Sequence, residues 1–108
     1  MKTNILVTLQ YEAQHCWLGC PFEEVGFLKH PHRHLFYIEI EKAVAHSDRD
    51  IEIIMFKQQV YNYIDAKYNH QFGSKSCEML AEELLIQFDC HCVSVKEDNE
   101  NGAKVYNI

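Results

Sequence analysis

The sequence predicts an α+β fold: a four-stranded antiparallel sheet with two helices on one face, in the order ββααββ. Three observations lead to this prediction. Apolar and polar residues alternate in two segments of the N-terminal half, as they do in half-buried strands. Two central segments repeat apolar residues every three or four positions, which is typical of amphipathic helices. Alternation then returns near the C-terminus, and 108 residues suit a single domain spanning 1–108.

The first two strands are expected at residues 4–13 and 34–44. Both segments mix β-branched and aromatic residues with polar ones. In the second, the apolar side chains on one face are Phe36, Ile38 and Ile40. Residues 16–31 contain two glycines and two prolines, so they are expected to form a long loop.

The two helices are expected after Ile51 and after Ser76. The first spans about four turns, with apolar residues at helical spacing in Met55, Phe56, Val60, Tyr63 and Ile64. Residues 69–75 break the pattern, and Ser76 is a suitable N-cap for the second helix. Its apolar stripe comprises Met79, Leu80, Leu84, Leu85 and Phe88.

The last two strands are expected at residues 90–95 and 103–106, joined by a hairpin turn over 97–102. A sheet this small leaves both of its edges exposed. Exposed strand edges pair readily with other chains, so the protein is expected to be a homo-oligomer.

Composition excludes several classes of function. The formal net charge is −6 and the acidic residues are spread over the chain, so nucleic acid is not an expected partner. No run approaches the roughly 20 apolar residues that span a bilayer, and the N-terminus lacks a secretory segment. We therefore expect a cytoplasmic protein with no membrane partner. Five cysteines, an odd number, are expected to be reduced thiols, with Cys77, Cys90 and Cys92 buried as small hydrophobic residues.

Four histidines give the clearest functional signal. His30, His32 and His34 occupy alternate positions where the second strand begins, and His15 closes the segment that starts at Tyr11. Alternate residues on a strand share a face, so several imidazoles would project from one surface. Three imidazoles with an open position are a common catalytic zinc set. The alternative, that they are solvated surface histidines, stays open on the pattern alone.

These residues carry a resemblance that spans nearly the whole chain. The sequence resembles the 6-pyruvoyl-tetrahydropterin synthase and 6-carboxy-tetrahydropterin synthase family of T-fold (tunnelling-fold) enzymes. Residues 11–15 resemble the family's F-x-A-x-H, and residues 32–40 resemble its H-G-H-x-[FY]-x-[VI]-x-[VI]. Residues 76–81 resemble [TS]-[TS]-E-x-[LV]-A, and residues 93–98 resemble V-x-V-x-E-T.

The resemblance implies roles for particular residues. It selects His15, His32 and His34 as ligands of a zinc ion and leaves His30 outside the set. It implies that Glu97 anchors a pterin ring, whose ring N–H and exocyclic amine suit a bidentate carboxylate. Ser76 and Glu78 match the second-helix motif and are implied at the ligand, although dipole and capping effects also explain Glu78.

The resemblance also implies an activity and an assembly. The family's enzymes are zinc-dependent lyases acting on 7,8-dihydroneopterin triphosphate, in pathways to tetrahydrobiopterin or to the deazapurine queuosine. Their sheets close into barrels, so a hexamer of two trimeric rings is implied.

The sequence departs from the family where proton transfer takes place. The family's Cys a few residues before H-x-H has no counterpart between Glu24 and His30. Groups that could replace it are Cys20, Glu24 and His30, with Cys16 and Glu23 also nearby. The family's Asp-His pair is represented only by His70. These gaps leave two alternatives open: a T-fold module that binds a pterin or purine without lyase chemistry, and an oligomeric interaction protein with no ligand.

Overall fold

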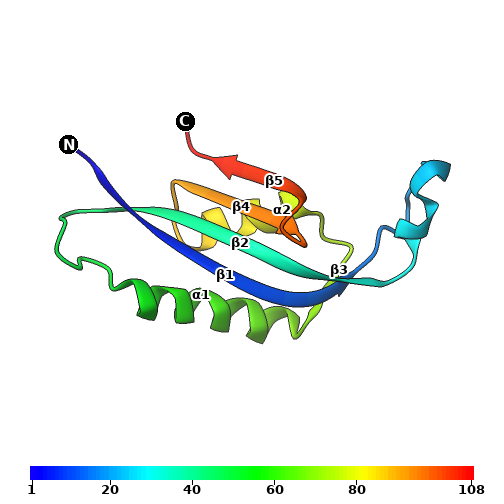
Figure 1. Cartoon of the computed structure of the whole chain (residues 1–108), viewed down its shortest axis with the longest axis horizontal. Coiled ribbons are helices and arrows are strands. Elements are labelled where there is room, and N and C mark those ends of the chain that lie inside the picture. The colour runs from blue at the N-terminus through cyan, green and yellow to red at the C-terminus, as the bar shows by residue number, and fades with distance from the viewer.

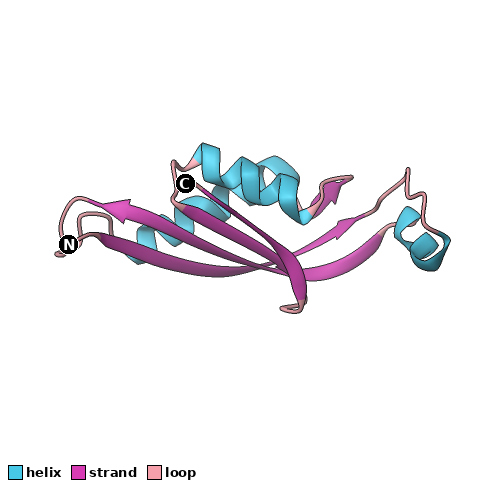
Figure 2. Ribbon diagram, turned by 90° about the horizontal axis from the view of Figure 1, so that it is seen from above, coloured by secondary structure: helices cyan, strands magenta, loops and turns pink.

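A five-stranded sheet forms the body of the protein, and two α-helices cover one of its faces (Figures 1 and 2). The computed structural model describes residues 1–108, with extents of 50 × 28 × 21 Å. The elements in chain order are β1 (Thr3–His15), the 3₁₀ helix η1 (Glu23–Lys29), β2 (His32–Val44), α1 (Ile53–Tyr68), β3 (Gln71–Gly73), α2 (Cys77–Gln87), β4 (Cys92–Glu97) and β5 (Asn101–Tyr106).

The sheet has the strand order β3-β1-β2-β4-β5. β1 and β2 pair antiparallel along their whole length, from Thr3 opposite Val44 to His15 opposite His32. β2 with β4 and β4 with β5 are also antiparallel, whereas the short β3 runs parallel to the end of β1. The connection that carries η1 projects from the end of this long hairpin (Figure 1).

The core lies between the helices and one face of the sheet. Alternate residues of β1, β2 and β4 point into it, and the buried ones on β2 are Phe36, Ile38 and Ile40, as expected. The helices contribute Phe56, Val60, Ile64, Leu80, Ala81 and Leu84. The apolar alternation of β1 and β2 therefore determines which side chains lie on the core face of the sheet at every position, including the ends of the strands.

The α+β class is confirmed, but the four-stranded ββααββ order is wrong because a fifth strand lies between the helices. β3 occupies the segment that was expected to be a loop. Gln14 N donates to His70 O at 3.0 Å and Cys16 N donates to Gly73 O at 2.9 Å, which adds this segment to the edge of β1. Phe72, in the middle of β3, is buried. Three residues are too few to show a period, so pattern alone could not reveal this strand.

The N-cap of α2 is confirmed, whereas the cap of α1, Glu52, was not predicted and the apolar stripes are only partly correct. The Ser76 hydroxyl accepts a hydrogen bond from Met79 N at 3.1 Å, which confirms the N-cap of α2. Met55 and Met79, however, are 71% and 54% exposed, so their assignment to the buried stripes was wrong. The 3₁₀ helix η1 in the loop between β1 and β2 was not predicted, since it buries no residue and leaves no apolar periodicity.

The expected burial of three cysteines is confirmed. All five are free, and Cys77, Cys90 and Cys92 are buried. Burial raises the pKa of Cys77 to about 12 and that of Cys90 to about 11, so neither is a ready thiolate at neutral pH.

No helix of the protein combines the length and the apolarity that crossing a membrane requires.

Gly102 allows β5 to lie close against β4, and its substitution tests this packing. A Cβ atom there would lie 2.0 Å from Val95 O, which is backbone and cannot move aside. We expect Gly102→Ala to lower the free energy of unfolding by about 1–3 kcal/mol, the usual cost of overpacking. Urea denaturation measures the change. Gly26→Ala is the control, because a Cβ at Gly26 meets nothing within 4 Å; equal midpoints for the two variants would contradict this account.

Candidate metal centre

Three histidines meet at the end of the β1–β2 ladder. His15 is the last residue of β1 and lies opposite His32, the first residue of β2, while His34 follows two residues along β2. All three side chains lie on the face of the sheet that carries Tyr11 and Phe36, because strand residues two apart share a face. The cluster therefore continues the core face at the point where the helices no longer cover it.

The imidazole rings form a compact, half-buried group. Ring centroids of His15 lie 4.5 Å from those of His32 and 5.1 Å from those of His34, and the His32 and His34 centroids are 5.0 Å apart. One ring nitrogen from each residue lies within 4.8 Å of the other two. The Phe36 ring packs edge-on against the His15 ring, with centroids 5.2 Å apart, and limits the rotation of that imidazole.

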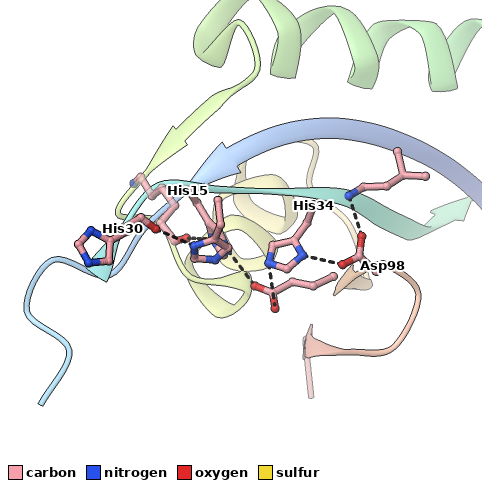
Figure 3. A network of polar contacts seen from close by, with 8 residues as sticks. His15, His30, His34 and Asp98 are labelled. Carbon is pink, nitrogen blue, oxygen red and sulfur yellow. Dashed lines mark hydrogen bonds and ion pairs between the residues drawn. The ribbon is translucent and has the colours of Figure 1, made fainter. Parts of the chain in front are cut away.

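Oxygen atoms engage the Nδ1 atoms of all three rings. His32 Nδ1 lies 2.8 Å from His30 O, His34 Nδ1 lies 2.6 Å from Asp98 Oδ2, and His15 Nδ1 lies 3.4 Å from Lys75 O. Each of these oxygens is an acceptor, so Nδ1 carries the proton and the lone pair is left on Nε2. Figure 3 shows His15, His34 and Asp98 with these contacts dashed.

The free Nε2 atoms indicate what the cluster can hold. Nε2 of His15 and of His32 are buried and have no hydrogen-bond partner. Unpaired buried polar atoms are costly and therefore uncommon. Three imidazoles that each bring one ring nitrogen within 4.8 Å of the others, with oxygen partners at Nδ1, match the ligand chemistry of zinc. On this test the residues fit a zinc ion.

Glu97, the last residue of β4, stands beside the cluster. Its Oε2 lies 3.2 Å from His15 Nε2 and its Oε1 lies 3.8 Å from His34 Nε2. The Glu97–His15 pair lies within ion-pair distance but does not form a hydrogen bond, so His15 Nε2 has no hydrogen-bond partner. The contact raises the pKa of His15 against the opposing effect of burial, and it lowers the pKa of Glu97. The Glu97 carboxylate is therefore ionised at neutral pH.

A cavity of about 490 Å³ opens next to the histidines. Its walls come from the ends of β1 and β2, the β4–β5 hairpin and the start of α2, and they include His15, His32, Glu97, Ser76, Glu78 and Cys16. This volume is within the range of small-molecule sites. The cavity thus brings together five of the residues expected to hold a metal or a ligand, and the sixth, His34, contacts His15 without lining the cavity.

The four expected proton-transfer groups lie elsewhere in the chain. Cys20 is buried in the loop, with Sγ 3.7 Å from Phe22 O and from Val25 O. Glu24 is exposed on η1, and the His30 side chain is exposed, although its carbonyl holds His32. The His70 ring stacks on Tyr11 with centroids 4.7 Å apart. None of these four side chains lines the cavity within one chain.

Sequence reasoning missed Asp98, which contacts His34, and Asp65, which lies near His70. Asp65 Oδ1 accepts a hydrogen bond from Tyr11 Oη at 2.8 Å and lies 3.5 Å from His70 Nε2. A left-handed turn at Asn69 and His70, with φ of 46° and 65°, brings the two residues together. Asn in a turn is a signal for this conformation, but the partner of His70 could not be read from it.

Comparisons with known proteins inform the fold only. No protein-family model matches the sequence, and no curated protein matches it. One solved structure with a similar fold is the crystal structure of an uncharacterized protein, WS1659, from Wolinella succinogenes. The two have a TM-score of 0.57 and 12% sequence identity, over 100% of this chain and 99% of that chain. The likeness supports the mixed α+β architecture.

Metal content distinguishes the cluster from ordinary surface histidines. We expect about one zinc per chain in the wild type, as for other three-histidine sites, and a loss of stoichiometric zinc in His32→Ala. Elemental analysis after desalting measures both. His30→Ala is the matched control, since it removes the neighbouring imidazole and keeps the His30 carbonyl that holds His32. Full zinc in His32→Ala, or equal loss in His30→Ala, would contradict the assignment.

Proposed function

We propose that the protein is a T-fold enzyme of the tetrahydropterin synthase type, a zinc-dependent lyase acting on 7,8-dihydroneopterin triphosphate or a closely related pterin. The observation that carries the proposal is the meeting of ring nitrogens from three histidines beside a cavity whose wall also holds the Glu97 carboxylate. The similarity of four sequence segments to the family's motifs supports the substrate class.

His15, His32 and His34 hold the metal through Nε2 in this proposal. Bound zinc supplies a Lewis acid that stabilises negative charge developing on substrate oxygen atoms. The contacts at Nδ1 keep the three rings in one orientation, so the protein does not need to reorganise them when a ligand arrives. The His15 and His34 side chains are 10% and 21% exposed, so both rings are largely shielded from solvent.

Glu97 orients the heterocycle. Its two oxygens can accept hydrogen bonds from a ring N–H and an exocyclic amine at the same time, a contact that aliphatic or purely acidic ligands do not offer. The contact with His15 lowers the pKa of Glu97, so the carboxylate remains a hydrogen-bond acceptor throughout the neutral range. Ser76 and Glu78 lie on the opposite wall, at the start of α2.

Cys16 is the group that we assign to proton transfer. It follows His15 and it is a half-buried thiol on the cavity wall, whereas burial raises the pKa of Cys77, the other thiol there, to about 12. Cys20 faces two carbonyl oxygens inside its own loop. Cys16 would remove a proton from the substrate side chain as that side chain is rearranged and triphosphate leaves.

Product analysis with 7,8-dihydroneopterin triphosphate tests the proposal. Zinc-loaded wild type is expected to release triphosphate and form a pterin with a shortened or rearranged side chain. Cys16→Ser should lower kcat by about 100-fold or more, the usual contribution of a general base, without loss of zinc. Cys20→Ser is the control and should keep wild-type turnover. Equal effects of the two substitutions would contradict the assignment of Cys16.

We also propose that the chain forms a homo-oligomer, a hexamer of two trimeric rings. β5 leaves one edge of the sheet without a partner, and its residues are largely exposed. Assembly would bring groups such as His70 of one chain near the cavity of another, since within one chain His70 does not reach it. Sedimentation at the mass of a single chain would contradict this proposal.

A pterin- or purine-binding module without lyase activity is the second candidate. It is favoured by the positions of Cys20, Glu24, His30 and His70, which all lie outside the cavity. Zinc and pterin binding without triphosphate release would support this function over the lyase.

A further inference from the structure

Asp98 is an exposed turn residue whose side chain and backbone are both fixed to β2. Its Oδ2 lies 2.6 Å from His34 Nδ1, and its Oδ1 accepts a hydrogen bond from Leu35 N at 3.0 Å. Its own backbone N donates to Leu35 O at 2.8 Å. The carboxylate is therefore held at two points and the backbone at a third, all on neighbouring residues of the adjacent strand.

The turn that carries Asp98 has the geometry needed to point its side chain this way. Asp98 and Asn99 have φ of 54° and 56°, and Glu100 N donates to Glu97 O at 2.9 Å. Asp and Asn are the residues that most readily adopt positive φ in such turns. This turn directs the Asp98 side chain back toward β2 while Glu97 remains on the cavity wall.

His34 differs from the other two histidines in the charge of its Nδ1 partner. His15 and His32 contact neutral carbonyl oxygens, whereas His34 contacts an anion at the shortest of the three distances. A carboxylate on Nδ1–H holds the ring in one tautomer and makes the remaining lone pair on Nε2 a stronger metal donor. The Nδ1 atoms of His15 and His32 have no carboxylate partner.

We propose that Asp98 is a positioning residue that fixes the Nδ1–H tautomer of His34 and thereby sets the affinity of the three-histidine site for zinc. The proposal rests on the proposed metal site. It adds Asp98, which lies outside the cavity, to the metal centre. The β4–β5 turn thereby becomes part of that centre, because its Asp98 carboxylate contacts the proposed ligand His34.

Asp98→Asn is the sharpest test, because it keeps the shape of the side chain. The amide can offer its oxygen to Leu35 N only by turning its NH₂ toward His34 Nδ1, which then must accept a hydrogen bond and move its proton to Nε2. If the amide takes the opposite orientation, its NH₂ faces the Leu35 N–H and the turn contact is lost. Either arrangement weakens the site.

Zinc affinity and the tautomer of the His34 ring are the two quantities to measure. Zinc affinity by competition with a chelator is expected to fall about 10- to 100-fold in Asp98→Asn, the range for such outer partners of metal ligands. Nitrogen-15 shifts of the His34 ring in metal-free protein are expected to report Nδ1–H in the wild type and a changed tautomer population in the variant. Trp17, the single tryptophan, lies on the cavity wall and provides an independent fluorescence signal for zinc binding.

Asp50→Asn is the matched control. Asp50 also contacts an imidazole, with Oδ1 3.5 Å from His46 Nε2, and its Oδ2 also accepts a backbone hydrogen bond, from Ala45 N at 2.7 Å. It is far from the cavity lining, so zinc affinity in Asp50→Asn should equal that of the wild type.

The outcomes separate this inference from the proposed function. Wild-type zinc binding with unchanged affinity in Asp98→Asn would overturn the role of Asp98 and leave the lyase proposal standing. A wild type that binds no zinc would overturn the proposed metal site and the affinity claim with it. In that case the metal-free tautomer measurement would still decide whether Asp98 orients His34, and a wild type with the proton on Nε2 would overturn that as well.

Discussion

The register between β1 and β2 is the constraint on which the candidate site depends. The two strands pair over their full length, and the pairing ends with His15 opposite His32. A slip of one residue would move every side chain to the other face of the sheet. Buried residues such as Tyr11 and Phe36 resist that slip, because they would lose their place in the core. The packing of the core therefore also fixes the geometry of the three histidines, which share its face of the sheet.

The orientation of the rings depends on a wider part of the fold. The oxygen that contacts His32 belongs to the β1–β2 loop, the one that contacts His15 belongs to the β3–α2 loop, and the one that contacts His34 belongs to the β4–β5 turn. Three separate connections must adopt their native paths before all three rings have their oxygen partners at Nδ1. The cluster is therefore a property of the complete domain, and the cavity beside it is enclosed by the same connections.

Sequence patterns predicted the elements with strong periodicity and missed features that depend on contacts distant in sequence. The long strands, both helices and the Ser76 cap follow from alternation, helical spacing and capping chemistry. β3 is held by backbone hydrogen bonds to β1 and has no pattern of its own. In the site, the alternation of His32 and His34 indicated a shared face, whereas Asp98 lies 64 residues from His34 and is brought to it only by the strand pairing and the turn. The position of Cys16 on the cavity wall likewise depends on the path of the β1–β2 loop, which no sequence pattern indicates.

X-ray absorption at the zinc edge of the zinc-loaded protein would show directly whether the three histidines hold the metal. We expect a first shell of nitrogen and oxygen atoms at about 2.0–2.1 Å with the outer-shell scattering of imidazole rings, as three histidine ligands and one oxygen ligand give. A sulfur shell at about 2.3 Å would contradict it, since that distance marks thiolate ligands. Cys16 and Cys77 both line the cavity, so the measurement distinguishes two donor sets that this fold places side by side.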